Sequence, residues 1–250
     1  MQKDQLYIPI KELDPSNIKK SSKIVMIGKP GTGKSSIIAS ILFLKKHLYP
    51  VIQVFSGTEN HTGFFKQFVP ELFIYDDIDE EAIMYFVKRQ VIAKKYLENP
   101  YGVLVIDDCT DDPKILNKPL FQKLYKNGRH FNMLFILSLQ YALDIKPNIR
   151  NNIDGVFIMR ETNINTRKKL WENYASVIPT FSMFCKIMDE ITSDYTALYI
   201  DNQTTTNDYR DCIYYYKAPI NLPKYIWFGS DYCHDFNNQR SNPDYTPPIL

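Results

Sequence analysis

The sequence is poor in the residues that build metal centres and disulfide frameworks. Its four cysteines, Cys109, Cys185, Cys212 and Cys233, lie far apart, form no CxxC pair and have no histidine at metal-ligand spacing. This pattern favours neither a zinc site nor a disulfide-rich scaffold. We therefore expect a protein of a reducing compartment.

Charge of one sign and long apolar runs are also scarce. The 30 basic and 28 acidic residues give a formal net charge of +2, so the overall charge does not require a nucleic-acid partner. The longest apolar run, near residues 133–139, is far too short to span a bilayer. Residues 1–16 lack the basic-then-apolar pattern of a secretion signal. We expect a soluble intracellular protein with no membrane span and no secretion signal.

The sequence does contain an alternation of strand and helix patterns, in a chain of 250 residues of which 44% are hydrophobic. Chains of this length bury a sizeable core. Short apolar runs predict strands at residues 23–28, 51–57, 72–77, 102–108, 133–140 and 155–160. Helical periodicity predicts helices at Lys34–His47, Glu80–Leu97, Lys114–Asn127 and Asn165–Tyr174, the last capped by Thr162 or Asn163. This alternation is typical of an α/β fold with a mainly parallel sheet covered on both faces.

The pattern changes after about residue 190. Two alternating apolar runs within residues 195–219 flank a polar, Asn-rich connection, which predicts a β-hairpin on the edge of the sheet. The last thirty or so residues are rich in Pro, Tyr and Asn, and they predict an irregular tail that lies on the domain or on a neighbour. We therefore expect one domain over residues 1–217 and a tail over residues 218–250.

One motif points directly to a ligand. The segment GKPGTGKS, residues 28–35, matches the complete G-x-x-x-x-G-K-[ST] pattern, between a predicted strand and the first turn of a predicted helix. Backbone N–H groups of such a loop and the positive end of the helix hold nucleotide phosphates. Lys34 is expected to reach the β and γ oxygens, and the Ser35 hydroxyl to ligate Mg²⁺. The candidate nucleotide-binding residues are Gly28, Lys29, Pro30, Gly31, Thr32, Gly33, Lys34, Ser35 and Ser36.

Acidic residues follow the apolar strand predicted at 102–108, at the sheet edge where α/β proteins bind ligands. Asp107 is the candidate Mg²⁺ ligand, through water, and Asp108 is the candidate base that deprotonates the attacking water. Asp111 and Asp112 are better explained as a helix N-cap. The YDD segment at 75–77 competes for these roles, but helix capping and first-turn acids explain it with fewer assumptions.

Gln140, near Ser138 at the end of the strand predicted at 133–140, is a further catalytic candidate. In P-loop proteins with an extra strand between the phosphate-loop strand and the metal-binding strand, a polar residue at the tip of that strand faces the γ-phosphate. Gln140 either aligns the attacking water there or is an exposed residue entering a loop. The chain has no NKxD-type segment that reads guanine.

Together the segments GKPGTGKS, VLVIDDC, NGRHFNMLFILSLQY, FIMRETN and ALYIDN...YYYKAP resemble the genome-packaging ATPases of nucleocytoplasmic large DNA viruses, poxvirus-type enzymes of the FtsK/HerA superfamily. The likeness covers roughly residues 20–217. It implies an ASCE (RecA-like) P-loop NTPase sheet, a homo-oligomeric ring, and ATP hydrolysis coupled to movement of double-stranded DNA into a capsid. It also implies capsid or vertex proteins as partners, in the virion or the host cytoplasm. The superfamily commonly has Glu where this chain has Asp108.

An arginine from a neighbouring subunit often completes such sites, and Arg129 in NGRH matches the Gly-Arg block of the superfamily. The preceding helix should run back to the amino edge of the sheet, so Arg129 either acts in trans or caps the helix end beside Asn127 and Gly128. Arg160, at the carboxyl end of its strand, is either a sensor in its own site or half of an ion pair with Glu161.

Two basic segments are candidates for contact with DNA phosphates, which needs no sequence recognition. The alternative is a solvated helix face. The residues are Lys114, Lys118, Lys123, Lys126 and Arg129 in the first segment and Arg167, Lys168 and Lys169 in the second.

Two other classes of function compete with the packaging motor. A P-loop kinase of nucleosides or small metabolites would need an acceptor for turnover, whereas an ATPase would not. A nucleotide-dependent switch or assembly protein would hydrolyse ATP poorly because Asp108 is short, and DNA would not stimulate it.

Overall fold

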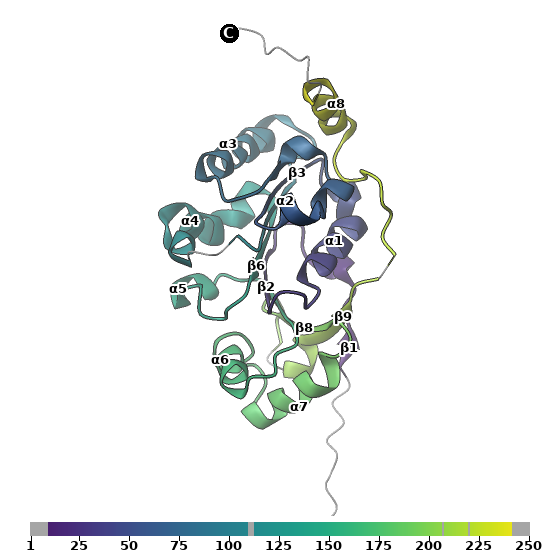
Figure 1. The fold of residues 1–250 in the computed structure, drawn as a ribbon. Helices are drawn as coiled ribbons and strands as arrows, with labels where there is room; N and C mark the ends of the chain where they lie inside the picture. Colours follow the sequence, from purple (N-terminus) through teal and green to yellow (C-terminus); the bar gives the residue numbers. More distant parts are fainter. Residues whose placement is uncertain (1–9, 110–112, 207, 220, 242–250) are drawn as a thin grey trace, which may run out of the picture.

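The computed structural model describes residues 10–109, 113–206, 208–219 and 221–241. These residues form a nine-stranded sheet with the order β1-β9-β8-β7-β2-β6-β5-β3-β4 (Figure 1). The strands are β1 (Lys11–Glu12), β2 (Lys23–Ile27), β3 (Val51–Ser56), β4 (Ile74–Tyr75), β5 (Gly102–Asp107), β6 (Met133–Leu139), β7 (Gly155–Ile158), β8 (Thr196–Asp201) and β9 (Ile213–Lys217).

The sheet is mainly parallel, as predicted. The strands from β7 to β4 in this order run parallel to one another, whereas β8 is antiparallel to β7 and β9 is antiparallel to β8. The predicted C-terminal hairpin is therefore confirmed, with the short β1 pairing in parallel along its outer side. β6 lies between the phosphate-loop strand β2 and the acidic strand β5, as predicted for the extra strand.

Helices cover both faces of the sheet, with α1 on one face and α3 to α7 on the other (Figure 1). None of the helices in the described part of the chain has the length and apolarity that a membrane crossing requires. The helices are α1 (Lys34–Lys45), α2 (Glu59–Thr62), α3 (Glu80–Tyr96), α4 (Pro119–Asn127), α5 (Pro147–Arg150), α6 (Ile164–Tyr174), α7 (Phe181–Ile191) and α8 (Asp231–Arg240).

Two hydrophobic clusters follow from the alternation of side chains along the strands. On β2, Ile24 faces the cluster that contains Ile37 of α1, and the next residue, Val25, faces the cluster that contains Leu124 of α4. β2, β5 and β6 are buried along their whole length, because helices cover both of their faces. Their carboxyl ends are thereby held in fixed positions.

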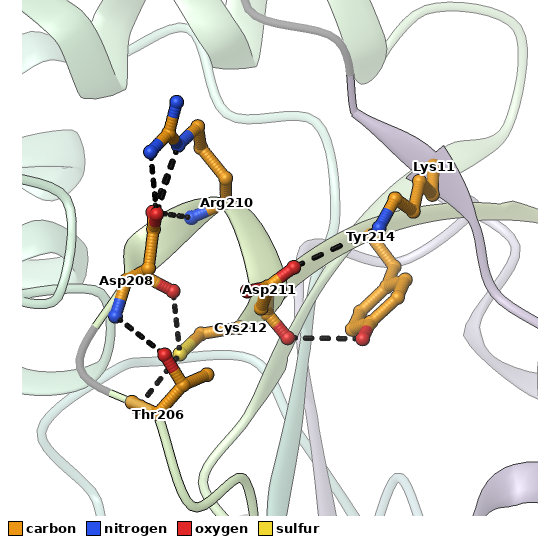
Figure 2. A network of polar contacts seen from close by, with 7 residues as sticks. All are labelled: Lys11, Thr206, Asp208, Arg210, Asp211, Cys212 and Tyr214. Atoms are coloured by element: carbon orange, nitrogen blue, oxygen red, sulfur yellow. Dashed lines mark hydrogen bonds and ion pairs between the residues drawn. The ribbon is translucent and has the colours of Figure 1, made fainter.

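Polar contacts hold the connection between β8 and β9 (Figure 2). Asp208 accepts the N–H of Arg210 at 3.0 Å and also pairs with its guanidinium, and the Cys212 thiol donates to the Asp208 carbonyl at 3.3 Å. Lys11 of β1 pairs with Asp211 at 3.7 Å. Because both partners of that ion pair are exposed, it adds little stability, but it joins β1 to the hairpin.

The helix predicted over Lys114–Asn127 is divided in two. A 3-10 helix covers Pro113–Asn117, and α4 begins only at Pro119. Lys118 between them is extended, with ψ of 154°, because the residue before a proline avoids the helical region. Asp111 and Asp112, predicted as the cap of this helix, lie outside the described residues.

Four α-helices were not predicted: the short α2 and α5, of four residues each, and the longer α7 and α8. α7 follows Thr180, whose side chain accepts the N–H of Met183 at 3.2 Å, an N-cap that the sequence does signal. α8 lies within the C-terminal segment expected to be irregular, so that expectation is wrong for residues 231–240. Asn237 of α8 accepts the Leu72 N–H at 3.1 Å, which fastens this helix to the domain. Of the two predicted caps of α6, the side chain of Asn163 accepts N–H groups of the first turn.

Candidate active site

The turn from β2 to α1 has glycine where no side chain fits. A Cβ on Gly28 would lie 2.4 Å from the Met159 Cβ, and Gly33, which precedes α1, has a left-handed φ of 96° that favours glycine. Because Gly33 has no side chain with which to cap α1, the first N–H groups of this helix remain available to an anion.

Lys34 points back into the loop formed by this turn. Its Nζ donates to the carbonyl oxygens of Gly28 at 2.6 Å and Lys29 at 3.1 Å, and the residue is 6% exposed. Burial lowers the pKa of Lys34, while the charges of Asp107 and Asp108 act in the opposite direction. The loop therefore encloses a cationic donor beside the N-terminus of α1.

Asp107 ends β5 next to this loop. Its Oδ2 accepts the Ser35 hydroxyl at 2.6 Å, whereas its Oδ1 is buried and has no hydrogen-bond partner among the described residues. Ser56, the register partner of Asp107 on β3, has a buried Oγ that likewise lacks one. Burial raises the pKa of Asp107, against the nearby hydroxyl groups of Ser138 and Ser35 and the charge of Lys34.

These oxygens fit a Mg²⁺ ion. Mg²⁺ prefers hard oxygen ligands, keeps several waters and binds through one or two carboxylates together with substrate phosphates. Ser35 and Asp107 supply a hydroxyl and a carboxylate that already meet, and the Oδ1 of Asp107 remains free to accept bonds from metal-bound waters. A buried carboxylate oxygen with no partner is costly, and a hydrated cation would remove that cost.

Asp108 and Gln140 meet beside this group. Gln140 Nε2 donates to Asp108 Oδ1 at 2.6 Å, and the Asp108 N–H donates to Ser138 Oγ at 3.4 Å. The φ of Asp108 is 54°, a left-handed conformation that Asp tolerates better than most residues. Gln140 is therefore not a residue that merely enters a loop, because it fixes the carboxylate predicted to be the base.

A cavity of about 760 Å³ joins these residues to more distant parts of the chain. It is lined by the phosphate loop from Pro30 to Ser36, except Thr32, and by Asp107 and Asp108. Further walls come from residues between 58 and 68, from Asp194 and Tyr195, and from residues between 217 and 224. The volume is within the range of cavities that hold a small molecule or a cofactor.

Arg129 lies at the other end of the parallel strands, in the 3-10 helix Gly128–Phe131 that precedes β6. Its guanidinium pairs with Asp154, which also accepts the Lys23 N–H at 2.9 Å. Near the C-terminus of α4, the carbonyl oxygen of Tyr125 accepts a hydrogen bond from Lys23 Nζ at 3.1 Å. The helix-cap alternative for Arg129 is therefore wrong, and Arg129 is far from the phosphate loop of its own chain.

Glu161 pairs with the phosphate loop and not with Arg160. Lys29 Nζ lies 2.9 Å from Glu161 Oε1, which also accepts the Asn163 N–H at 2.7 Å. Burial opposes the charge of Glu161, but these hydrogen bonds outweigh it and lower the pKa of this carboxyl. Arg160 is exposed, so the predicted Arg160–Glu161 pair is wrong.

The predicted basic segments do not form one free surface. Lys118 pairs with Glu80, Lys123 lies 5.9 Å from the centre of the Phe131 ring, and Arg167 pairs with Asp189 at 2.7 Å. Arg167 also donates to the Glu161 carbonyl at 2.6 Å. Arg167 therefore joins α6 to α7 and to the Lys29–Glu161 pair.

Three residues of this region were not identified from the sequence. Ser56 had a usable signal, because it is a polar residue at the carboxyl end of an apolar strand, as Asp107 is. Glu161 follows the strand that ends at Ile158, at the same sheet edge, but its partner Lys29 is 132 positions away. Tyr195 has no local signal, since only the tertiary fold brings it to the cavity.

Sequence comparison finds relatives in viruses. Uncharacterized protein 088R of Invertebrate iridescent virus 3 is 52% identical over 228 residues, which is 87% of each chain. Uncharacterized protein 075L of Invertebrate iridescent virus 6 is 49% identical over 93% of this chain and 91% of the relative. An uncharacterized protein of Acanthamoeba polyphaga mimivirus is 30% identical over 94% of this chain and 84% of the relative. No family model matches the chain.

Structure comparison finds the same fold in solved proteins. The genome packaging NTPase B204 from Sulfolobus turreted icosahedral virus 2, in complex with sulfate, has a TM-score of 0.57 over 82% of this chain and 100% of that chain, with 17% identity. B204 in complex with ATP-gammaS has a TM-score of 0.53 over 83% of this chain and 100% of that chain, with 18% identity. The pCW3 conjugation coupling protein TcpA, a monomer with ATPgS, has a TM-score of 0.54 over 88% of this chain and 65% of that chain, with 14% identity. At these identities the likeness establishes the fold, a P-loop ATPase sheet with an antiparallel C-terminal edge.

Proposed function

This chain belongs to the family of iridovirus and mimivirus proteins that includes protein 088R, and from that premise we propose that it is a Mg²⁺-dependent ATPase that moves double-stranded DNA into a viral capsid. The fold that it shares with B204, whose name gives genome packaging, supports the packaging role. The ATP analogue in B204 supports the choice of nucleotide.

The observation that carries the proposal is the buried, incompletely paired group at the carboxyl ends of β2, β5 and β6. Lys34, Ser35 and Asp107 converge there, and Asp107 Oδ1 has no partner among the described residues. Most buried polar atoms are hydrogen-bonded, because each unpaired one costs free energy, so an unpaired carboxylate oxygen beside a phosphate loop favours a site that a ligand completes. This arrangement is suited to a bound phosphate and a hydrated cation.

Each residue then has a defined part. The backbone of residues 28–33 and the N-terminus of α1, including Ser35 and Ser36, surround the phosphates, and Lys34 leaves its two carbonyl partners to bond the β and γ oxygens. The Ser35 hydroxyl directly and Asp107 through water would hold Mg²⁺, which would supply positive charge next to the phosphate oxygens.

Asp108 is the proposed base and Gln140 its positioning residue. A general base must have its carboxylate directed at the attacking water, and the 2.6 Å bond from Gln140 fixes one oxygen of Asp108. Gln140 also aligns the water, since its amide lies beside the same carboxylate.

The proposal also covers how the subunits assemble and what the assembly contacts. We place Arg129 in the site of a neighbouring subunit of a homo-oligomeric ring, because its side chain is 61% exposed at the edge away from its own loop. The exposed lysines of α4 and α6, Lys123, Lys126, Lys168 and Lys169, are the proposed contacts to DNA phosphates. Capsid or vertex proteins are the proposed docking partners of the ring, and the proposed location is the virion or the assembly site in the host cytoplasm. Residues 1–217 form the ATPase domain and residues 218–250 its tail.

Steady-state ATP hydrolysis with and without double-stranded DNA at low salt tests the proposal. We expect turnover without a small-molecule acceptor and a clear rise with DNA, since phosphate contacts strengthen as salt falls. Lys34→Ala should lose nucleotide binding, which controls for contaminating ATPases. A turnover that needs a small acceptor would identify a kinase, and a turnover that DNA never changes would contradict the DNA-coupled motor.

A further inference from the structure

The cavity extends well beyond the residues that hold phosphates. A second wall comes from the turn before β8, from the end of β9 and from the segment that follows it, including Tyr195, Lys217, Pro219, Leu222 and Pro223. This wall offers an aromatic ring and apolar side chains, whereas the phosphate end offers N–H groups and Lys34.

Tyr195 directly adjoins the phosphate loop. A Cβ on Gly33 would lie 3.4 Å from Tyr195 Cδ1 and 3.5 Å from Tyr195 Cβ, so the tyrosine rests against the residue that opens α1. Tyr195 also lines the cavity and remains 65% exposed, so much of its surface is open to a ligand. A large aromatic side chain left open beside an anion site is suited to a ligand with a flat apolar part.

The backbone of this turn is unusual. Asp194 and Tyr195 both have left-handed φ values, 50° and 61°, and an aromatic residue rarely adopts this conformation. The Asp194 carboxylate pairs with Lys217 of β9, and the Thr196 N–H donates to the Ser193 carbonyl at 3.0 Å. Strain of this kind persists where the surroundings fix it, and it gathers at ligand sites.

We propose that Tyr195 stacks on the base of the bound nucleotide, and that the turn 193–196 forms the nucleoside half of the site. This inference rests on the proposed ATPase function, because it takes the phosphate loop as the anchor of the triphosphate. Stacking recognises the flat face common to all bases.

Binding constants for ATP and for inorganic tripolyphosphate separate base contact from phosphate contact. Tyr195→Asn removes the ring while keeping a residue that tolerates a left-handed φ, and Tyr195→Phe keeps the ring and is the matched control. We expect Tyr195→Asn to bind ATP about tenfold more weakly with an unchanged affinity for tripolyphosphate. Tyr195→Phe should match the wild type for both ligands.

Three results would overturn the inference: Tyr195→Asn binds ATP as tightly as the wild type, it loses affinity for both ligands equally, or Tyr195→Phe is as weak as Tyr195→Asn. The thermal unfolding midpoint of each variant shows that the compared proteins are folded. A wild-type protein that binds tripolyphosphate but not ATP would overturn the proposed function, whereas normal ATP binding without a Tyr195→Asn effect overturns only this inference.

Discussion

Two groups of buried charged side chains lie at opposite ends of the parallel strands, and they differ in how completely they are paired. At the amino ends, Asp154 accepts the Lys23 N–H at 2.9 Å, lies 3.6 Å from Lys23 Nζ and pairs with Arg129. At the carboxyl ends, Asp107 has one oxygen without a partner among the described residues, and Lys34 bonds two backbone carbonyls.

We interpret this difference as one between a structural group and the proposed ligand-binding group. A buried charge that is paired and hydrogen-bonded is tolerated, and breaking the pair is costly. A buried carboxylate with a free oxygen is retained where a ligand completes its bonds, as a hydrated Mg²⁺ would at Asp107. Substitutions at the amino ends should therefore affect stability, and those at the carboxyl ends should affect activity.

Arg129→Ala gives the hardest test of this division, because Arg129 lies at the structural end and yet is proposed to act on a neighbouring site. We expect hydrolysis by the assembled protein to fall by about 10³-fold or more, the size of an arginine-finger effect, with ATP affinity unchanged. Arg210→Ala, which removes an exposed arginine paired with Asp208, is the control.

Mixed assemblies decide how Arg129 acts. Subunits with Lys34→Ala contribute Arg129 but cannot bind nucleotide, whereas Arg129→Ala subunits retain the loop. Mixing the two should restore part of the steady-state hydrolysis. If no activity returns, or if Arg129→Ala alone is fully active, Arg129 belongs only to the structural group.

Asp108→Asn tests the group at the carboxyl ends of the parallel strands. The amide keeps the size of the side chain but cannot accept the proton of the attacking water, so turnover should fall about 10²- to 10⁴-fold. ATP affinity and the unfolding midpoint should stay near the wild-type values. Asp211→Asn, which alters an exposed carboxylate near Lys11, should leave turnover unchanged. Normal hydrolysis by Asp108→Asn would exclude Asp108 as the base.

The sequence predicted the carboxyl-end group better than the amino-end group. Local sequence patterns predict the carboxyl-end group, because GKPGTGKS precedes a helix and Asp107 ends an apolar strand. Parallel strands bring their carboxyl ends together at one edge of the sheet. The position of β6 between β2 and β5 was also predicted, and the hairpin followed from two alternating apolar runs, whereas the rest of the strand order was not predicted. The Lys23–Asp154 pair joins residues 131 positions apart at the amino ends, where no motif exists, so only the tertiary fold reveals it.

The elements that were missed have physical explanations of the same kind. Pro119 divides a run that looks periodic, because Lys118 cannot remain helical before it. α8 is polar and short of apolar periodicity, and its position depends on tertiary contacts such as that of Asn237 with the Leu72 N–H. Ion pairs such as Lys29–Glu161 depend on which strands are neighbours, which local sequence does not contain.

Asp154→Ala measures what the amino-end group contributes to stability. It leaves Lys23, with 4% of its side chain exposed, as a buried charge without its partner, and breaking a buried pair in this way costs about 3–5 kcal/mol. Urea unfolding should show this loss, whereas Asp211→Ala at the surface should cost less than about 1 kcal/mol. A loss at Asp154 no larger than at Asp211 would show that the group is not structural.

Glu161→Gln should have the smallest effect and a characteristic pH dependence. The folded-state pKa of Glu161 is lowered, so the unfolded state binds more protons as the pH falls, and the stabilisation is present above the unfolded pKa of about 4.3. It is lost as the pH falls through the lower folded pKa. Because Lys29 is 56% exposed, solvent screens the pair, and we expect at most about 1 kcal/mol near neutral pH.

Urea unfolding of both proteins across the acid range measures this difference. The difference in the free energy of unfolding between wild type and Glu161→Gln should be largest at neutral pH and should disappear as Glu161 is protonated. Glu172→Gln, which alters the exposed Lys168–Glu172 pair at 4.0 Å, should show a smaller gap throughout. A gap that persists unchanged into strong acid would mean that Glu161 stabilises the protein by packing, and that its charge does not help to hold the phosphate loop.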